Sequence, residues 1–377
     1  MNILMIVPKF PFPIAGGLEK QSFILSRSLT KLGCNVSVLS LKHCKKHKDF
    51  EKLNNINVTR LTDTFLSFKS QIVIAFKILL FFITNSKKID LVHIHQHSLL
   101  GIYSILVSKL FNKKVLLKLP NVGFKGLPGL KNYKFASIRY YIIKKADAIV
   151  SMTNIHKNEL LDIGYSINKI LMVPNGVESQ NNINKNDNDQ ITFTYVGRLV
   201  PQKGIDNLIH VWQDLSKNFK NINLEIWGHG SEFSSIEIKI KTGDLNNVFL
   251  RGHSDSLIEI YKNCDVFILP SFTEGMSNSI FEAMSFGIPV LASNVGGSDI
   301  QLKKYSDSCI FKSNDTDDLK SKIIGLINNK KRRNEIGLYN YNRVNEFFDI
   351  KKVAKAYFEN YNCIIQNKNL INYPIYD

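Results

Sequence analysis

Cysteine is scarce in this sequence of 377 residues, and its five copies are scattered without a C-x-x-C pair. Disulfide-stabilised secreted domains and structural zinc sites both depend on closely spaced cysteines. We therefore expect neither a disulfide framework nor a metal site. The first residues also lack the basic segment that opens a secretory signal peptide, so a cytoplasmic location is expected.

Two widespread phosphate-binding signatures are missing as well. The first strand-like run, residues 2–7, continues into a proline-rich loop and not into G-x-G-x-x-G, so the dinucleotide fingerprint is absent. The loop at residues 197–204 lacks the G-K-[ST] step of a Walker loop. The chain also has no nucleic-acid recognition motif and no strip of alternating basic and aromatic residues, so we expect no nucleic-acid partner.

Acidic residues are few in the first half of the chain. Residues 1–180 hold 26 Lys and Arg against 9 Asp and Glu, whereas residues 181–377 hold 23 of each. A basic surplus confined to one half indicates an anionic partner for that half, such as a membrane surface, a phosphorylated acceptor or a nucleic acid. The alternative is a lysine-rich composition that only covers a solvated surface.

Hydrophobic runs long enough to cross a bilayer are also lacking. Residues 71–83 are strongly apolar, but a spanning helix needs about 20 such residues, and Lys77 interrupts the run. Two interpretations stay open. The segment is either a buried helix of a domain, or an amphipathic helix that rests on a membrane beside Lys69, Lys87 and Lys88.

Short apolar runs alternate with helix-like segments along the chain, which predicts an α/β fold built on parallel sheets. The length favours two domains over one. The Asn- and Asp-rich tract 179–190 has no apolar periodicity and is the expected linker. We therefore expect an N-terminal domain at residues 1–180 and a C-terminal domain at residues 190–350. A final helix and tail, residues 351–377, should pack back toward the N-terminal domain.

The stretch 265–297 carries the most informative polar residues. An apolar run at residues 266–269 predicts a buried strand, and the loop that follows it contains Glu274 and Gly275. Ser277 is a candidate N-cap of the next helix. In open α/β sheets, ligands bind at the carboxyl ends of the strands. This loop is therefore the expected wall of an active site.

Other strand ends carry further candidate groups. Gly16 and Gly17 follow the first strand and would let a ligand approach the backbone closely. Arg198 and Lys203 lie in a glycine-bounded loop and would form a cationic clamp for phosphate oxygens. His95 is one of three histidines that alternate along a strand. Because no acidic or cysteine cluster accompanies them, contact of His95 with a substrate is favoured over metal binding.

Seven short motifs follow one another along the chain. They are G-G-x-E (16–19), D-L-V-H-I-H (90–95), P-N-G-V (174–177), G-R-L-x-x-x-K-G (197–204), G-H-G (228–230), E-G-M-S-N-S-I-F-E (274–282) and G-G-S-D (296–299). In this order they resemble the retaining glycosyltransferases of family 4. The resemblance implies the GT-B fold, in which two Rossmann-like, doubly wound parallel-sheet domains face each other across a cleft.

The resemblance also implies a nucleoside-diphosphate sugar as the donor, bound mainly by the C-terminal domain. Arg198 and Lys203 would neutralise the diphosphate and so take part in catalysis. Glu274 would face the donor sugar as the third catalytic residue, and Glu282 would bind the ribose hydroxyls. The remaining donor-side positions are Gly16, Gly17, Gly197, Gly228, Gly275, Met276 and Ser277. No D-x-D-type acidic pair occurs, so we expect no Mg²⁺ and no other cofactor.

The acceptor side departs from the family pattern. Many members end the strand that corresponds to residues 114–119 with T-x-H-G, whose histidine lines the reaction centre. In this chain Pro120 stands in its place. Lys118, Asn121 or a main-chain group would then contact the acceptor, with His95 as a further candidate.

The resemblance predicts a retaining, metal-independent hexosyltransferase that uses a UDP- or GDP-linked donor. Its acceptor would be lipid-linked or part of a surface glycan, in the synthesis of lipopolysaccharide, capsule or another polysaccharide. The basic N-terminal domain would dock at the anionic inner face of the plasma membrane. Two alternatives stay open: a nucleotide-sugar epimerase of the same fold, and a non-catalytic subunit of a glycosyltransferase complex.

Overall fold

The computed structural model describes residues 1–11, 16–43, 47–61, 68–123, 126–133, 135–180 and 190–376. The chain forms two compact units. The first consists of Met1–Gly176 with Ile350–Asp377, and the second is Val177–Asp349. Most of the expected linker, residues 181–189, lies outside the described residues, and the second unit begins before it.

The first unit is built on an eight-stranded sheet in the order β3-β4-β2-β1-β5-β6-β7-β8. Its strands are β1 (Asn2–Ile6), β2 (Asn35–Leu41), β3 (Phe50–Leu53), β4 (Ile56–Leu61), β5 (Leu91–Ile94), β6 (Lys114–Lys118), β7 (Ala148–Ser151) and β8 (Ile170–Met172). All neighbours are parallel except β3 and β4. The chain leaves β1 on one side and returns on the other at β5. These two strands therefore form a switch point, outside whose carboxyl ends ligands bind in open α/β sheets.

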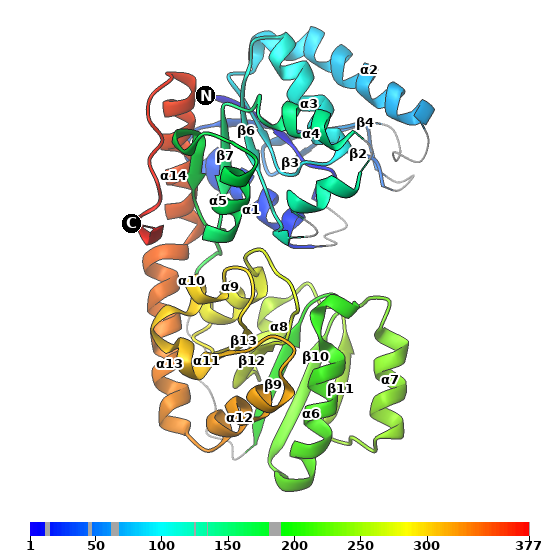
Figure 1. Cartoon of the computed structure of the whole chain (residues 1–377), viewed down its shortest axis with the longest axis vertical. Helices are drawn as coiled ribbons and strands as arrows, with labels where there is room; N and C mark the ends of the chain where they lie inside the picture. The colour runs from blue at the N-terminus through cyan, green and yellow to red at the C-terminus, as the bar shows by residue number, and fades with distance from the viewer. Residues whose placement is uncertain are drawn as a thin grey trace. The chain divides into compact units, whose positions relative to one another are not determined.

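Helices cover both faces of this sheet (Figure 1). They are α1 (Gly17–Lys31), α2 (Phe68–Asn85), α3 (Leu99–Leu110), α4 (Ala136–Ile143), α5 (Asn154–Asp162) and α14 (Ile350–Ile365), with short 3-10 turns η1 (Ser86–Lys88), η3 (Pro128–Asn132), η4 (Ile167–Lys169) and η8 (Pro374–Tyr376). The helices α2 to α5 share one hydrophobic core with the sheet, to which they contribute Ile78, Ile105, Ile142 and Leu160. The helix α1 packs against α14. Most of these strands are continuous apolar runs in the sequence because helices cover both faces of the sheet.

The end of the chain is fixed to the first unit by hydrogen bonds. Asn360 on α14 donates to the carbonyl oxygen of Ile371 at 2.9 Å and accepts from its N–H at 2.8 Å. Tyr373 N donates to the carbonyl oxygen of Met172 in β8 at 2.9 Å. The tail therefore returns along α14 and ends beside the last strand of this sheet.

The helix α2 has one buried and one exposed apolar face. Ile74, Ile78 and Phe82 are fully buried in the core of the first unit, whereas Phe76 is 57 % exposed. The segment Ser70–Lys88 is, by length and composition alone, apolar enough to cross a membrane. Its inner stripe nevertheless belongs to the core, as the buried-helix interpretation expected, and its outer stripe is left exposed.

The second unit is built on a six-stranded parallel sheet in the order β11-β10-β9-β12-β13-β14. Its strands are β9 (Ile191–Val196), β10 (Ile222–Trp227), β11 (Val248–Gly252), β12 (Val266–Leu269), β13 (Val290–Ser293) and β14 (Ile310–Phe311). Its helices are α6 (Ile205–Asn218), α7 (Phe233–Thr242), α8 (Leu257–Tyr261), α9 (Asn278–Ser285), α10 (Ser298–Leu302), α11 (Ser306–Cys309), α12 (Thr316–Ile327) and α13 (Lys330–Arg343), with turns η5 (Pro201–Lys203), η6 (Lys303–Tyr305) and η7 (Val344–Phe348). The chain continues from β9 to β10 on one side and crosses to β12 on the other. A second switch point therefore lies between β9 and β12.

Candidate functional site

The carboxyl ends of β9 and β12 bring the catalytic candidates of the second unit together. Arg198 and Lys203 lie in the loop after β9, and Glu274 lies in the loop after β12. Because the two strands are neighbours in the sheet, their loops meet, and Phe272 N donates to the carbonyl oxygen of Gln202 at 2.8 Å. This is the switch point at which an open α/β sheet binds its ligand.

An ion pair joins the same two loops. Lys203 Nζ contacts Glu274 Oε1, and Ser271 Oγ donates to that oxygen at 2.7 Å. The two charged side chains are only 16 % and 12 % exposed. A shielded ion pair is favourable when further hydrogen bonds satisfy the carboxylate, and Ser271 supplies one. Lys203 and Ser271 thus fix the direction of the Glu274 carboxylate, while Arg198 on the same loop is exposed to an incoming ligand.

Glycines let the neighbouring loops pack backbone against backbone. A Cβ atom on Gly228 would lie 1.9 Å from the carbonyl oxygen of Gly197, and one on Gly296 would lie 2.3 Å from that of Gly275. Gly228 and Gly296 also have positive φ angles of 141° and 60°, which other residues rarely adopt. The predicted donor-side positions Gly197, Gly228 and Gly275 therefore shape the edge of the sheet by keeping side chains out of it.

The first turn of α9 is not capped by a side chain. Ser277 occupies the N-cap position, as expected, but its hydroxyl lies 3.1 Å from Ser279 Oγ and not on a backbone N–H. Its carbonyl oxygen accepts from Gln301 Nε2 at 2.8 Å, which holds the turn in place. The N–H groups at a helix N-terminus carry partial positive charge. This turn, with Gly275 and Met276 before it, therefore suits phosphate or hydroxyl oxygens.

Glu282 lies inside the second unit, where it is only 6 % exposed. The hydroxyl of Tyr261, on α8, donates to Glu282 Oε2 at 3.4 Å. Burial and the nearby charge of Glu282 raise the pKa of Tyr261 well above its usual value, so this phenol remains a donor. A role as an ordinary surface carboxylate is therefore excluded. A shielded carboxylate of this kind can recognise hydroxyl groups specifically, because leaving it unpaired would be costly.

In the first unit, the predicted Gly16 and Gly17 lie at the start of α1. Gly16 is the N-cap and has no side chain to cap the helix, while residues 12–15 of the preceding loop lie outside the described residues. Gln21, one turn into α1, donates to the carbonyl oxygen of Gly176 at 2.7 Å and accepts from its N–H at 3.2 Å. This paired amide, which the sequence did not reveal, fixes α1 to the P-N-G-V motif.

The acceptor-side candidates Lys118 and His95 are buried. Lys118 Nζ donates to Asn175 Oδ1 at 2.7 Å and lies 5.5 Å from the ring centroid of Tyr357 on α14. Burial lowers the pKa of Lys118 to about 7. Burial and the charge of Lys118 lower the pKa of His95 to about 3, and its ring stacks on His93 at 4.1 Å. Lys118 thus anchors the P-N-G-V segment, and its contact with an acceptor stays a prediction, as does that of His95.

A polar cluster beside Asn121 was not predicted. His156, in the first turn of α5, donates its Nε2–H to the carbonyl oxygen of Asn121 at 2.6 Å, and Glu159 accepts from Gly123 N at 2.7 Å. Burial lowers the pKa of His156 to about 4 and raises that of Glu159. The cluster brings a histidine to the loop in which Pro120 replaces the family histidine. The only local signal for this cluster is the i, i+3 spacing of His156 and Glu159 on one helix.

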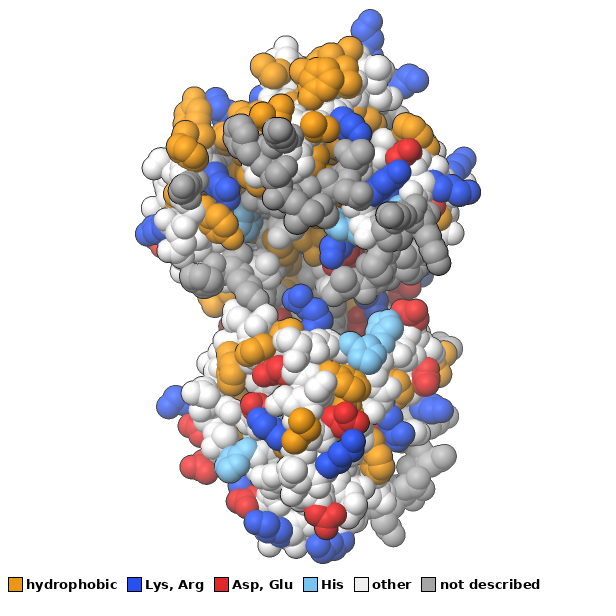
Figure 2. Space-filling view, turned by 90° about the vertical axis from the view of Figure 1, so that its right-hand side faces the viewer, with side chains coloured by type: hydrophobic (Ala, Val, Ile, Leu, Met, Phe, Trp, Pro, Cys, Tyr) orange, Lys and Arg blue, Asp and Glu red, His pale blue; other side chains and the backbone are white. Residues whose placement is uncertain are grey.

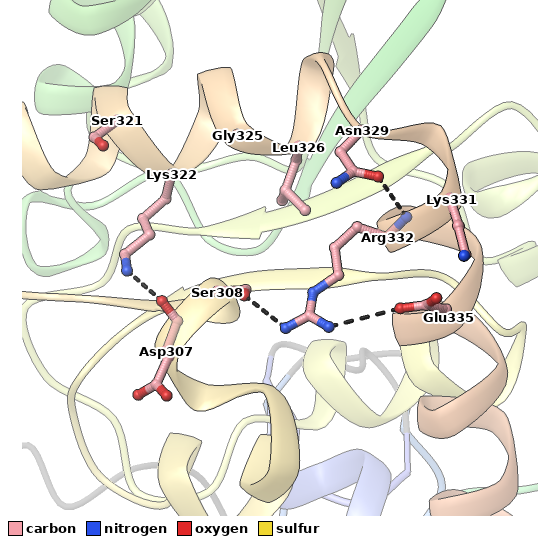
Figure 3. Close-up of a pocket in the computed structure, with 10 residues that line it drawn as sticks. All are labelled: Asp307, Ser308, Ser321, Lys322, Gly325, Leu326, Asn329, Lys331, Arg332 and Glu335. Carbon is pink, nitrogen blue, oxygen red and sulfur yellow. Dashed lines mark hydrogen bonds and ion pairs between the residues drawn. The ribbon is translucent and has the colours of Figure 1, made fainter.

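The second unit also contains a polar cavity of about 510 Å³ between α11, α12 and α13 (Figure 3). Arg332, on α13, reaches Ser308 Oγ on α11 at 3.0 Å and pairs with Glu335 of its own helix at 3.6 Å. Lys322, on α12, donates to the carbonyl oxygen of Asp307. None of the predicted site residues lines it. Across the described part of the chain, no group of three or more His, Cys, Asp or Glu is arranged to hold a metal ion.

Comparison with known proteins gives matches to both units. The family described as "Glycosyltransferase Family 4" matches residues 15–181, and "Glycosyl transferases group 1" matches residues 177–343. An uncharacterized glycosyltransferase of Methanocaldococcus jannaschii is 30 % identical over 258 residues, which are 68 % of this chain and 70 % of that protein. The UDP-Gal:alpha-D-GlcNAc-diphosphoundecaprenol alpha-1,3-galactosyltransferase of Escherichia coli is 30 % identical over 211 residues, covering 50 % of this chain and 52 % of that enzyme.

Solved structures share the architecture of the whole chain. The sucrose-phosphate synthase of Thermosynechococcus elongatus has a TM-score of 0.81 at 19 % identity, covering 97 % of this chain and all of that one. HepE of Anabaena, in complex with UDP-glucose, has a TM-score of 0.76 at 16 % identity, covering 95 % of this chain and 98 % of that one. At these identities the likeness establishes the fold. The expected α/β fold with two Rossmann-like, parallel-sheet units of the GT-B type is thereby confirmed.

Proposed function

The chain belongs to the glycosyltransferases of family 4 and group 1, and we propose that it transfers a sugar from a UDP- or GDP-linked donor to a hydroxyl group of a lipid-linked or surface-glycan acceptor. Polysaccharide biosynthesis is the setting that its relatives support, since the Escherichia coli relative is named for a diphosphoundecaprenol-linked acceptor. The observation that carries the proposal is the shielded Lys203–Glu274 pair at the β9–β12 switch point, beside the uncapped turn of α9.

In this proposal, positive charge around the switch point binds the donor. Arg198 and Lys203 take the diphosphate and stabilise the negative charge that grows on the leaving nucleoside diphosphate. Glu282 accepts hydrogen bonds from the ribose hydroxyls, and Glu274 accepts them from the donor sugar. Two cations and a helix N-terminus then supply the charge that Mg²⁺ supplies elsewhere. Neither a metal ion nor another cofactor is part of the proposed reaction.

The proposed reaction retains the configuration of the sugar. The bond between the anomeric carbon and the diphosphate oxygen breaks, and its electron pair leaves with the nucleoside diphosphate. The acceptor hydroxyl oxygen attacks the anomeric carbon from the same face, and its proton passes to an oxygen of the leaving phosphate. Glu274 is the carboxylate nearest this chemistry, but Lys203 and Ser271 already engage its Oε1. A carboxylate stabilised in this way is a weak nucleophile, which supports a route without a covalent intermediate.

A membrane surface is the proposed site of the reaction. The first half of the chain carries the entire positive surplus of 17 charges, which favours an anionic leaflet such as the inner face of the plasma membrane. A cytoplasmic, peripheral enzyme would meet both its soluble donor and its lipid-linked acceptor there.

Incubation of the purified protein with polyprenyl-diphosphate-linked acceptors and a panel of UDP- and GDP-sugars tests the proposal. Release of nucleoside diphosphate should require the acceptor and persist in EDTA, and NMR of the product should show the anomeric configuration of the donor. Free sugar formed without any acceptor would instead indicate an epimerase. Tight nucleotide binding without turnover would indicate a non-catalytic subunit.

A further inference from the structure

The outer face of α2 carries a stripe of large apolar side chains. Its members, each between 45 % and 58 % exposed, are Ile72, Val73, Phe76, Leu80 and Ile83. At 3.6 residues per turn these positions span about 100° of the helix, opposite the stripe that enters the core. The outer face of a helix in a soluble domain is normally polar. The stripe therefore needs a partner other than the core of its own unit.

A second exposed apolar group runs from the end of η3 into α4. Its members, between 55 % and 74 % exposed, are Tyr133, Phe135, Ile138 and Tyr141. The last three are spaced three residues apart and form a ridge. Phe135 is held with a φ of 62°, which is unfavourable for a bulky residue, and yet its ring gains no shelter from water. Arg139 lies 4.7 Å from the ring centroid of Tyr133, and Lys145 lies 4.4 Å from that of Tyr141.

The two apolar groups belong to one layer of the fold. The helix α3 packs against both α2 and α4, and all three helices share one core with the sheet (Figure 1). In the space-filling view, hydrophobic side chains gather on the upper part of the first unit, with lysine and arginine side chains near them (Figure 2). We call α2 and the η3–α4 segment, with their flanking cations, the α2–α4 surface.

Positive charge dominates the segment of chain that forms this surface. Residues 64–147 contain 14 Lys and Arg against two acidic residues, Asp90 and Asp147. Lys118 is buried and Lys109 pairs with Asp147, so the other cations supply the charge. Lys87, directly after α2, and Lys145, directly after α4, are exposed. An apolar stripe bordered by cations is the composition of segments that lie in the interface of an anionic membrane. Aromatic residues beside cations are likewise typical of the interfacial region, where a ring can enter the acyl boundary while the charge stays at the head groups.

We propose that the α2–α4 surface docks on an anionic lipid bilayer, with the α2 stripe and the Phe135–Ile138–Tyr141 ridge inserted side by side into its interfacial region. The protein lies on the membrane and does not span it, because Ile74, Ile78 and Phe82 hold the inner face of α2 in the core. Docking through this surface rests on the proposed function, in which the enzyme works at a membrane. Binding to a bilayer requires neither a donor nor an acceptor, so it can be tested independently of glycosyl transfer.

Depth-dependent tryptophan quenching tests the insertion directly. The two native tryptophans, Trp212 and Trp227, are buried in the second unit, so a new tryptophan on the surface can be distinguished from them. In Phe76→Trp and Phe135→Trp variants, vesicles of brominated phosphatidylcholine and phosphatidylglycerol should quench the added emission and shift it to the blue. In an Ile238→Trp variant, whose new tryptophan lies on α7 at a site that is 60 % exposed, the vesicles should neither quench the added emission nor shift it. Equal quenching of all three, or quenching of none, would overturn the proposal.

Sedimentation with vesicles measures the contribution of each element. Binding should be strong with phosphatidylglycerol present, weak with phosphatidylcholine alone, and reduced by salt. The double variants Phe76→Ser/Ile83→Ser and Phe135→Ser/Tyr141→Ser should each bind at least tenfold more weakly, while Ile238→Ser binds like the wild type. All five positions are exposed, so each variant should unfold at the same temperature as the wild type. A lower unfolding temperature would identify a variant that fails to fold properly. If the serine variants bind normally but abolish a dimer seen by light scattering, the surface joins two copies of the chain and the bilayer assignment is wrong.

Vesicle binding and glycosyl transfer can fail separately. A protein that binds anionic vesicles without transferring sugar contradicts the proposed function and leaves the α2–α4 surface intact. A protein that transfers sugar to a water-soluble acceptor analogue but does not bind anionic vesicles contradicts only the surface.

Discussion

In the second unit, the charged residues of the predicted site lie at the carboxyl edge of the sheet. In the first unit, the charged residue predicted at the same edge is buried inside the protein. Lys203 and Glu274 close a shielded pair beside the exposed Arg198 at the β9–β12 edge. At the β5–β6 edge, Lys118 instead bonds Asn175 inside the protein. The same architecture thus carries the proposed donor-binding edge in one unit and a fixed internal contact in the other. On the α2–α4 surface of the first unit, Lys87 and Lys145 are exposed.

The largest expected effect comes from the Lys203–Glu274 pair. Lys203→Ala and Glu274→Ala should each lower kcat/KM by about 100-fold or more, as expected when a group that stabilises transition-state charge is lost. Vesicle binding should be unchanged, because the α2–α4 surface lies in the other unit. Initial rates and vesicle sedimentation, measured on the same preparations, check both statements.

A matched lysine in the second unit provides the control. Lys239 forms an exposed ion pair with Asp206, with side chains 43 % and 48 % exposed, and exposed pairs contribute little. Lys239→Ala should therefore keep wild-type rates. Equal losses of sugar transfer and of vesicle binding in Lys203→Ala would contradict the assignment of donor binding to the second unit and of membrane binding to the first.

A smaller effect is expected at Glu282. Glu282→Gln keeps the shape of the side chain but removes the charge that would accept the ribose hydroxyls. Donor affinity should fall by about tenfold to 100-fold, the range for a hydrogen bond to a charged group. Isothermal titration with UDP-glucose and its 2′-deoxy analogue measures this loss. The wild type should prefer the ribose form and the variant should not; an unchanged preference would show that Glu282 does not contact the ribose.

The smallest effect concerns pH and the buried Lys118. Burial lowers its pKa from 10.5 to about 7, so the unfolded chain binds more protons than the folded chain between these two values. The free energy of unfolding should therefore rise with pH across this window, by at most about 1.4 kcal/mol per pH unit from this group. In Lys118→Met that contribution disappears and the curve is flatter. Urea unfolding at several pH values checks it, and parallel curves for the two proteins would contradict the buried, titrating lysine.

Sequence reasoning succeeded where each motif is local and each strand is an uninterrupted apolar run. The strand predicted at residues 266–269 has these bounds in the structure, and the final helix expected from residue 351 begins at Ile350. The meeting of Arg198, Lys203 and Glu274 at one edge of the sheet could be predicted because each lies in a loop that follows a buried strand. Topology alone then brings the ends of adjacent strands together.

The parts that were missed depend on contacts between distant residues. Polar residues interrupt β3 and β4, so neither strand is a continuous apolar run, and β14 has only two residues. The amide pair of Gln21 with Gly176 and the bond of Lys118 to Asn175 join residues 155 and 57 positions apart. No local pattern encodes such pairs. The burial of Lys118 was not predicted, because an isolated lysine is seldom buried.

The most direct test of the account is acceptor-dependent turnover of the wild type and Lys203→Ala in the presence of EDTA. The account predicts that the wild type releases nucleoside diphosphate and forms a glycosylated lipid with the anomeric configuration of its donor. Lys203→Ala should fold normally, bind vesicles normally and show about 1 % of that rate or less. Turnover that needs a divalent metal, an inverted product, or full activity in Lys203→Ala would contradict it.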